Sequence, residues 1–123
     1  MVIEDDQDTC TLVRSRLMSV GFDVLTAHDG ETGLHHARSR KPDLIVLDLM
    51  LPKLPGEEVC KAIREDEDVE IANIPIVMFT AKDALVDRVV GKIIGATSYV
   101  VKPSSGSKLV QEIIQALPPE DEL

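Results

Sequence analysis

The chain has 123 residues, of which 44% are hydrophobic and only 2% aromatic. This length fits one domain with its own core, built from aliphatic side chains. The net charge of −9 argues against direct binding to nucleic acid or to an anionic membrane, and it is compatible with cation binding. No stretch is long enough to cross a bilayer and no signal peptide is evident, so we expect a cytoplasmic protein. Cys10 and Cys60 lack metal-ligand spacing and fit buried free thiols of a reducing compartment.

The amino-terminal third alternates short apolar strands with helices. We expect a strand at 1–3, a helix from an N-cap at Asp8 to a stop at Gly21, a strand at 22–27 and a polar helix at 31–40. His35 and His36 are adjacent on that second helix and point in different directions, so they form a poor joint metal site. We expect surface histidines there.

The stretch 42–52 organises the chain. Residues 44–47 (Leu-Ile-Val-Leu) are continuously apolar, which is typical of a strand buried on both faces of a parallel sheet. The run ends at one acidic residue, Asp48. Ligands of open α/β sheets bind beyond the carboxyl ends of the strands. We therefore expect Asp48 to be the reactive residue of a ligand site.

The remaining chain repeats the alternation of strand and helix. A loop at 51–56 leads into a helix that begins near Glu57 and ends in a solvated acidic stretch at 65–68. We then expect a strand at 74–79, a helix from an N-cap at Asp83 to Gly95, a strand at 98–101 and a last helix from 104–107 to Leu117. The domain should span residues 1–117, followed by a tail or the start of a linker at 118–123.

Five strand–helix units of this kind predict an α/β fold with right-handed crossovers. The central strands are apolar throughout, so helices must cover both faces and form a three-layer sandwich. The expected architecture is a flavodoxin-like (βα)5 fold with a five-stranded parallel sheet. We take its strand order as 2-1-3-4-5, the known order of that fold, which places strands 1 and 3 side by side.

Polar residues fall at the same end of this fold. Glu4 and Asp5 follow the first strand, Asp48 the third, Thr80 the fourth and Lys102 the fifth. Each alone has an ordinary structural explanation as a turn, cap or strand residue. Together, the three acids would crowd into one pocket, which is unfavourable unless a cation joins them. Carboxylates with several waters suit Mg²⁺.

Four motifs lie at separations that are specific as a set, although each alone is modest. They are Val-Ile-Glu-Asp-Asp (2–6), Pro-Asp-Leu-Ile-Val-Leu-Asp-Leu-Met-Leu-Pro (42–52) with Gly56, Ile-Pro-Ile-Val-Met-Phe-Thr-Ala-Lys (74–82) and Gly-Ala-Thr-Ser-Tyr-Val-Val-Lys-Pro (95–103). In this order the chain closely resembles the receiver domain of two-component response regulators. The resemblance covers essentially the whole sequence.

The resemblance implies that Asp48 is a phosphoacceptor. It would take a phosphoryl group from a phosphohistidine of a sensor histidine kinase or a histidine phosphotransfer protein. Mg²⁺ would be held by Asp5, by Asp48, by the backbone carbonyl of Met50 and, through water, by Glu4. Asp6 would be the non-ligand acid of the motif. Such a domain is a signalling module that catalyses only its own phosphotransfer and dephosphorylation.

The resemblance also assigns the residues that respond to the phosphoryl group. Lys102 would contact one phosphoryl oxygen, Thr80 would move to hydrogen-bond another, and Tyr99 would swing inward behind Thr80. The family further implies a cis peptide bond between Lys102 and Pro103. A phosphoryl group at Asp48 can therefore bias a two-state arrangement of the neighbouring loop and helix.

The helix expected at 83–94 carries more apolar residues than one buried face needs, namely Val86, Val89, Val90, Ile93 and Ile94. With the strand 98–101 and the last helix, it would form the switching face that contacts a partner, an output domain or a second copy. Thr97-Ser98 stands where an Asp pair is frequent in the family, and Ser104 stands where Phe often follows Lys-Pro. The absence of this Asp pair argues against the dimer mode that one large DNA-binding subfamily uses.

Three other functions compete with the phosphorylated switch. A haloacid-dehalogenase-like phosphatase would need a second Asp two residues after Asp48, where Met50 stands. A receiver fold that signals by contacts alone ranks below the switch, because the acidic and basic site residues are all present. A DNA-binding regulator would need a recognition helix and a different charge.

Overall fold

The computed structural model describes residues 1–84 and 95–118. Parallel strands pair into one five-stranded sheet of order β2-β1-β3-β4-β5. The strands are β1 (Val2–Ile3), β2 (Thr26–Ala27), β3 (Ile45–Leu47), β4 (Ile76–Ala81) and β5 (Ser98–Lys102). The predicted strand order is therefore confirmed.

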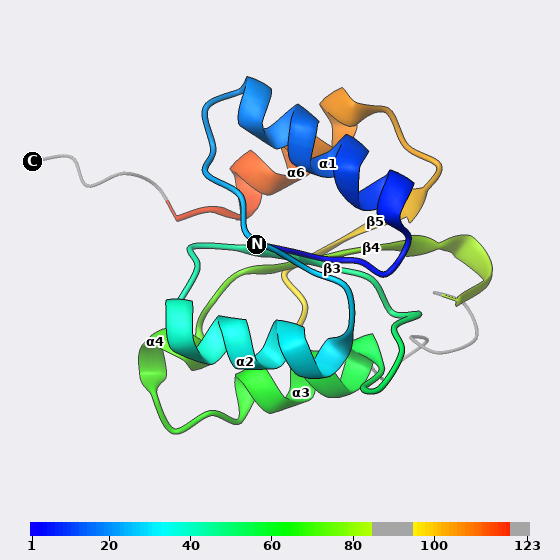
Figure 1. The fold of residues 1–123 in the computed structure, drawn as a ribbon. Helices are drawn as coiled ribbons and strands as arrows, with labels where there is room; N and C mark the ends of the chain where they lie inside the picture. Colours follow the sequence, from blue (N-terminus) through cyan, green and yellow to red (C-terminus); the bar gives the residue numbers. More distant parts are fainter. Residues whose placement is uncertain (85–94, 119–123) are drawn as a thin grey trace, which may run out of the picture.

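Helices cover both faces of this sheet, as Figure 1 shows. On one face lie α1 (Gln7–Ser19) and α6 (Gly106–Ala116). On the other lie α2 (Gly30–Arg40), α3 (Gly56–Arg64) and the short α4 (Val69–Ala72). The predicted three-layer α/β architecture is confirmed.

The apolar run of β3 supplies both halves of the core. Ile45 and Leu47 belong to the cluster beneath α2 and α3, whereas Val46 belongs to the cluster beneath α1 and α6. Successive side chains of a strand point to opposite faces, so a strand covered by helices on both sides must be apolar at every position. Cys10 and Cys60 are free and buried within the same clusters, as predicted.

Two predicted boundaries are wrong in the amino-terminal part. The N-cap of α1 is Asp6, whose carboxylate accepts a hydrogen bond from the Thr9 N–H at 2.9 Å, and Asp8 lies inside the helix. The strand expected at 22–27 is confined to Thr26–Ala27. Its pairing partner β1 begins only at Val2, which pairs with Thr26, so the earlier residues have no β1 residue opposite them.

The acidic stretch 65–68 is not simply a solvated helix end. Asp66 accepts a hydrogen bond from Arg38 at 3.0 Å, and Asp68 pairs with Lys41 at 2.8 Å. Asp68 also caps α4, a helix that the periodicity did not predict. These two ion pairs join the end of α2 to the segment after α3.

Other predictions concern the surface and the segment after β4. His35 is exposed and His36 partly so, as expected. Lys82 and Asp83 are already helical, so Asp83 is not a cap. The apolar residues predicted for the helix at 83–94 all lie outside the described residues. Within the described part of the chain, no helix has the length and hydrophobicity to span a membrane.

Gly56 begins α3 against the chain that leaves β3. Its N–H donates to the Leu49 carbonyl at 3.0 Å. A Cβ at this position would lie 2.1 Å from the Asp48 carbonyl oxygen and 2.7 Å from the Leu49 Cα. Both obstacles are backbone atoms, so only glycine allows this close approach. The absence of a side chain at Gly56 thus helps to position Asp48.

We expect Gly56→Ala to lower the free energy of unfolding by roughly 1–3 kcal/mol, because the added methyl group overpacks the backbone beside Asp48. Gly106→Ala is the matched control, since Gly106 also begins a helix but its Cβ would meet only the end of the Arg16 side chain. Urea denaturation of both variants measures the difference. Equal stabilities would contradict the proposed packing constraint.

Candidate functional site

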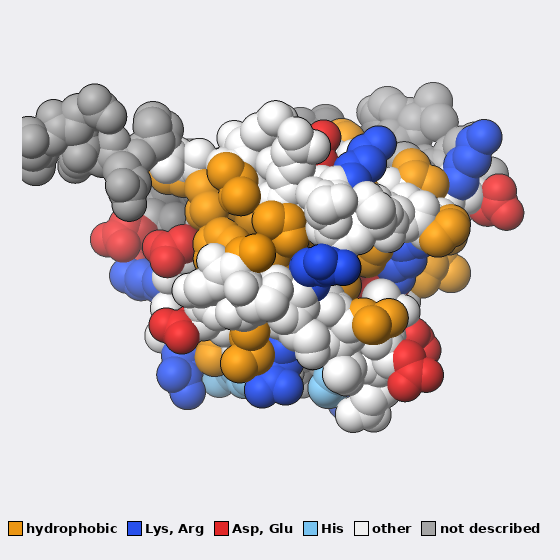
Figure 2. Space-filling view, turned by 90° about the horizontal axis from the view of Figure 1, so that it is seen from above, with side chains coloured by type: hydrophobic (Ala, Val, Ile, Leu, Met, Phe, Trp, Pro, Cys, Tyr) orange, Lys and Arg blue, Asp and Glu red, His pale blue; other side chains and the backbone are white. Residues whose placement is uncertain are grey.

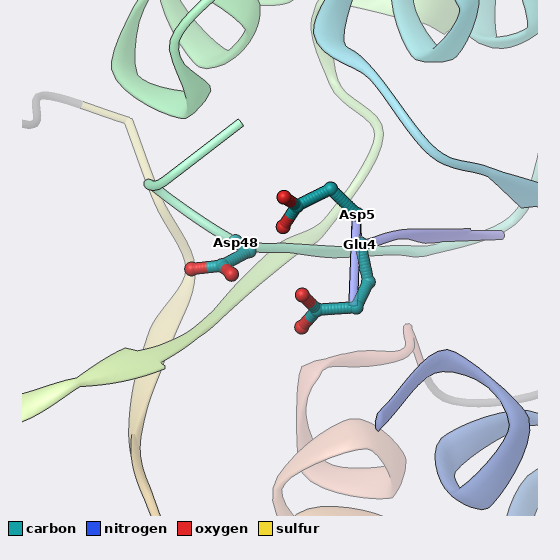
Figure 3. A group of neighbouring side chains, drawn as sticks. All are labelled: Glu4, Asp5 and Asp48. Carbon is teal, nitrogen blue, oxygen red and sulfur yellow. The ribbon is translucent and has the colours of Figure 1, made fainter. Parts of the chain in front are cut away.

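The acidic residues predicted to meet do so at the carboxyl edge of the sheet. Ile3 of β1 pairs with Leu47 of β3, so Glu4 and Asp48 leave neighbouring strands at the same level. Figure 3 shows Glu4 and Asp5 extending from the end of β1 toward the end of β3, where Asp48 lies. One oxygen from each carboxylate lies within 4.8 Å of the others. Glu4 and Asp48 are buried, whereas Asp5 is exposed.

Lys102, the last residue of β5, reaches across β4 to this group. Its ammonium donates to Glu4 Oε1 at 2.6 Å and to Asp48 Oδ2 at 3.2 Å. It also lies 5.4 Å from the centre of the Phe79 ring. The sequence pattern indicates only that Phe79 is a strand residue. The signal for its contact with Lys102 is its position directly before Thr80, because the end of β4 borders the site.

Burial changes the protonation of this group. It raises the pKa of Glu4 to about 7, with the charge of Asp48 adding to the effect and the hydrogen bond from Lys102 opposing it. Burial alone would lower the pKa of Lys102, but its contacts with Glu4 and Asp48 raise it overall. One ammonium therefore does not fully offset the neighbouring carboxylates, which is the condition under which a further cation would bind.

The residues next to the acids hold the loops in place. The N-cap Asp6 donates its backbone N–H to Glu4 Oε2 at 3.2 Å. Met50 donates its N–H to Asp48 Oδ1 at 3.3 Å. The capping function of Asp6 is compatible with its predicted place outside the metal ligands.

Thr80 and Tyr99 lie at different depths. Thr80 is in β4 with no exposed surface, and its hydroxyl is a buried polar atom without a hydrogen-bond partner among the described residues. Tyr99 lies on β5 opposite Met78 and is 40% exposed. The structure therefore places Thr80 beside the strand ends and Tyr99 nearer the surface. The Lys102–Pro103 bond is cis, as the resemblance implied.

Comparison with known families identifies the family of this chain. The profile of the response regulator receiver domain family matches residues 1–114. The chain is a response regulator receiver domain. It is thus a signalling domain of a two-component system, as its motifs indicated.

Named relatives of this receiver domain are transcriptional regulators. It is 48% identical over 105 residues to the alkaline phosphatase synthesis transcriptional regulatory protein PhoP of Bacillus subtilis, covering 85% of this chain and 42% of that protein. It is 39% identical over 123 residues to the probable transcriptional regulator ycf27 of Porphyra purpurea, covering 100% of this chain and 49% of that protein. The chain thus spans about half the length of these relatives.

Solved structures share the fold closely. The chemotaxis response regulator CheY4 of Vibrio cholerae has a TM-score of 0.83 and 29% identity, over 94% of this chain and 95% of CheY4. The receiver domain of sensor histidine kinase PA1611 from Pseudomonas aeruginosa has a TM-score of 0.84 and 27% identity, over 94% of this chain and 93% of that domain. The latter structure has a magnesium ion coordinated in its active site cleft.

Glu4 should make the folding stability of the domain depend on pH. In the folded chain without divalent cations its pKa is about 7, against 4.5 ordinarily, so the folded state retains a proton that the unfolded state loses. Stability should therefore fall as pH rises from about 4.5 to about 7. In Glu4→Gln this pH-dependent loss of folding stability, roughly 1–3 kcal/mol, should be absent. Urea denaturation across this range in a chelator measures the difference.

The exposed Glu31→Gln serves as the control for Glu4→Gln, since it removes one carboxylate that is not part of the acidic group. Its stability should follow the same pH dependence as the unmodified chain. If Glu4→Gln also follows that dependence, the raised pKa of Glu4 is contradicted.

Proposed function

We propose that this receiver domain accepts a phosphoryl group on Asp48 and thereby switches a partner or output domain. The observation that carries the proposal is the position of Asp48. Its buried carboxylate stands at the sheet edge with Lys102 at 3.2 Å and two further acids beside it. A nucleophile, a fixed positive charge and a cation-attracting cluster are what phosphoryl transfer requires.

The reaction transfers a phosphoryl group from a histidine nitrogen to a carboxylate oxygen of Asp48. A carboxylate oxygen of Asp48 attacks the phosphorus of a phosphohistidine, a P–O bond forms, and the P–N bond breaks with its electron pair leaving on the imidazole. The product on Asp48 is an acyl phosphate. Lys102 already pairs with both Glu4 and Asp48 and is partly exposed. Its ammonium can therefore move to pair with a phosphoryl oxygen once the phosphoryl group is on Asp48.

Mg²⁺ is the metal that this donor set fits. All three side chains offer hard carboxylate oxygens, and the exposed Asp5 leaves room for water. We assign Asp5, Asp48 and the Met50 backbone carbonyl as ligands, with Glu4 acting through water because Lys102 already occupies its Oε1. The ion would neutralise charge on the equatorial phosphoryl oxygens.

Thr80 is our candidate for the first element of the switch. Its hydroxyl is buried and unpartnered, and a buried polar group without a partner costs about 1–3 kcal/mol. A phosphoryl oxygen on Asp48 would supply the missing acceptor. The half-exposed Tyr99 can then turn inward as Thr80 moves.

The partners we propose are a sensor histidine kinase or a histidine phosphotransfer protein, acting in the cytoplasm, and a partner, output domain or second copy on the switching face. That face comprises the segment 83–94, β5 and α6. Ser98 of β5 donates to Glu112 of α6 at 2.8 Å, and Thr97 Oγ1 accepts from Ile76. Thr97 and Ser98, which stand where the family often has two Asp residues, thus form hydrogen bonds within the chain. This argues against a dimer whose contacts use acids at those positions.

Intact mass after incubation with phosphoramidate tests the phosphoacceptor. We expect the mass of one added phosphoryl group with Mg²⁺ and at least a tenfold lower yield in a chelator, because uncompensated carboxylates repel the donor. Asp48→Ala should gain nothing. Asp43→Ala, which changes an acid at the opposite end of the same strand, should be labelled like the unmodified chain.

Labelling of Asp48→Ala would contradict the choice of phosphoacceptor. If the unmodified chain is not labelled and does not bind Mg²⁺ by calorimetry, the domain signals by contacts alone. If it binds Mg²⁺ and accepts phosphate only from a histidine-phosphorylated protein, the assignment of Asp48 stands.

Thr80→Val tests the switch. Valine has nearly the same shape without the hydroxyl, so the unphosphorylated domain should be more stable by about 1 kcal/mol in urea denaturation. Mg²⁺-dependent labelling of Asp48 should continue. The amide chemical-shift changes that phosphorylation causes in β5 should shrink by at least half. Unchanged shifts in β5 would contradict this function of Thr80.

A further inference from the structure

The guanidinium of Arg64, the last residue of α3, joins two separate parts of the chain. Its Nη1 donates to the carbonyl oxygens of Ala72 at 2.9 Å and Ile74 at 2.7 Å, just before β4 begins. Its Nε donates to the carbonyl oxygen of Gly95 at 2.7 Å, just before β5 begins. Hydrogen bonds from a charged donor are stronger than those between neutral groups. One side chain therefore holds the entrances of β4 and β5 to the end of α3.

Gly95 allows the Arg64 side chain to lie directly on the backbone. A Cβ at Gly95 would be 2.7 Å from Arg64 Cγ and 3.0 Å from its Nε. Gly95 also has a φ of +105°, which residues with a side chain rarely adopt. The contact between α3 and the entrance of β5 is therefore closer than a side chain at position 95 would permit.

Thr97 fastens the entrances of β4 and β5 to each other. Its N–H donates to the Ile76 carbonyl oxygen at 2.7 Å, and its hydroxyl accepts from the Ile76 N–H at 3.1 Å. From there the two strands run in parallel to their carboxyl ends, where Ala81 pairs with Lys102. The Lys102 ammonium is 3.2 Å from Asp48. The strand pair is thus held at its amino ends and borders the phosphorylation site at its carboxyl ends.

Tyr99 points to the face of the sheet that α3 covers. Its neighbour Val100 belongs to the core cluster beneath α1 and α6. Successive residues of a strand point to opposite faces, so Tyr99 points away from those two helices. Figure 2 looks onto the α1–α6 side, where hydrophobic and basic side chains lie among uncharged polar ones. Tyr99 therefore points toward the side that is turned away from that view, where α3 lies (Figure 1).

One face of α3 follows the chain that enters β5. Arg64 contacts Gly95, and Cys60 lies one helical turn earlier on the same face of α3. Burial raises the pKa of the Tyr99 hydroxyl, and Cys60 is close enough to add to this rise. Because Tyr99 is 40% exposed, an inward turn would bring its ring toward α3. The room for that ring depends on the separation between α3 and β5, which the contact of Arg64 with Gly95 fixes.

From this geometry, and resting on the proposed function, we infer that Arg64 is a positioning residue of the switch. It holds α3 and the entrances of β4 and β5 at the separation that the inward position of the Tyr99 ring requires. Without these bonds, a movement of Thr80 would displace the loosened strand entrances rather than bring Tyr99 inward. The hydrogen bonds of Arg64 go to backbone carbonyls and not to the acids around Asp48, so phosphorylation itself should not depend on it.

Arg64→Met tests this inference, because methionine keeps an unbranched side chain but has no hydrogen-bond donor. The chain has one tyrosine and no tryptophan, so its intrinsic fluorescence reports on Tyr99. Phosphorylation of the unmodified chain by phosphoramidate and Mg²⁺ should reduce acrylamide quenching of this fluorescence, relative to Mg²⁺ alone. In Arg64→Met the reduction should shrink by at least half, whereas intact mass should show the same labelling of Asp48.

Gly95→Ala tests the same contact from the backbone side, because the added methyl group would displace Arg64. Gly21→Ala is its matched control, since Gly21 has a similar φ of +100° but a Cβ there would meet nothing within 4 Å. The response of Tyr99 should shrink in Gly95→Ala and persist in Gly21→Ala.

Arg38→Met is the control for Arg64→Met. Arg38 is also a basic residue in the last turn of a helix, but its guanidinium donates to the Asp66 carboxylate. The response of Tyr99 should therefore persist in this variant. All variants are compared at a temperature at which circular dichroism shows them folded, so that a general loss of stability does not alter the quenching.

The outcomes separate the positioning of Tyr99 from the phosphoacceptor. A full response of Tyr99 in Arg64→Met and Gly95→Ala would overturn the inference and leave the assignment of Asp48 intact. An equal loss in either control would also overturn it, because the effect would not depend on the contacts of Arg64. So would a loss of labelling in Arg64→Met, because Arg64 would then affect the reaction itself.

The unmodified chain decides the remaining cases. If it is labelled and the quenching of Tyr99 does not change, both the inference and the proposed movement of Tyr99 are overturned, whereas Asp48 remains the phosphoacceptor. If it is labelled neither by phosphoramidate nor by a histidine-phosphorylated protein, the proposed function itself is contradicted.

Discussion

The excess of negative charge at the carboxyl edge of the sheet is the constraint on which the site depends. Parallel pairing of β1 with β3 places one carboxylate oxygen each of Glu4, Asp5 and Asp48 within 4.8 Å of one another, and the Lys102 ammonium pairs with Glu4 and Asp48. Burial makes the imbalance costly, as the raised pKa of Glu4 indicates. The folded domain is thus built to gain stability from any cation that this pocket admits.

The surrounding fold keeps this unfavourable group together. The β3 strand is anchored in both halves of the core, and Gly56 lets α3 approach the Asp48 carbonyl more closely than any side chain would permit. Lys102 is fixed at the end of β5, two strands from Asp48, and reaches it past Phe79. The repulsion between the carboxylates is offset by packing elsewhere in the fold.

The sequence predicted the layers and the meeting of the acids with Lys102, because these depend on periodic and terminal patterns once the known strand order of the fold is adopted. The sequence did not predict the strand bounds and helix caps, which depend on contacts with other residues. The strand at 22–27 is confined to Thr26–Ala27, the residues that pair with β1. Asp6 rather than Asp8 caps α1, since the Asp6 carboxylate accepts a hydrogen bond from the Thr9 N–H. The short α4 is stabilised by a cap at Asp68, which carries no periodic signal.

The proposed switch is favoured if the unphosphorylated state leaves a polar group without a hydrogen-bond partner. Thr80 provides this, because its buried hydroxyl has no partner among the described residues. An unpartnered buried hydroxyl costs about 1–3 kcal/mol, and each 1.4 kcal/mol is a tenfold change in an equilibrium. A phosphoryl acceptor that removes this cost can therefore shift the two conformations by roughly tenfold or more. The burial of Thr80 at the end of β4 would thus link the proposed phosphorylation of Asp48 to β5, the neighbouring strand that carries Tyr99.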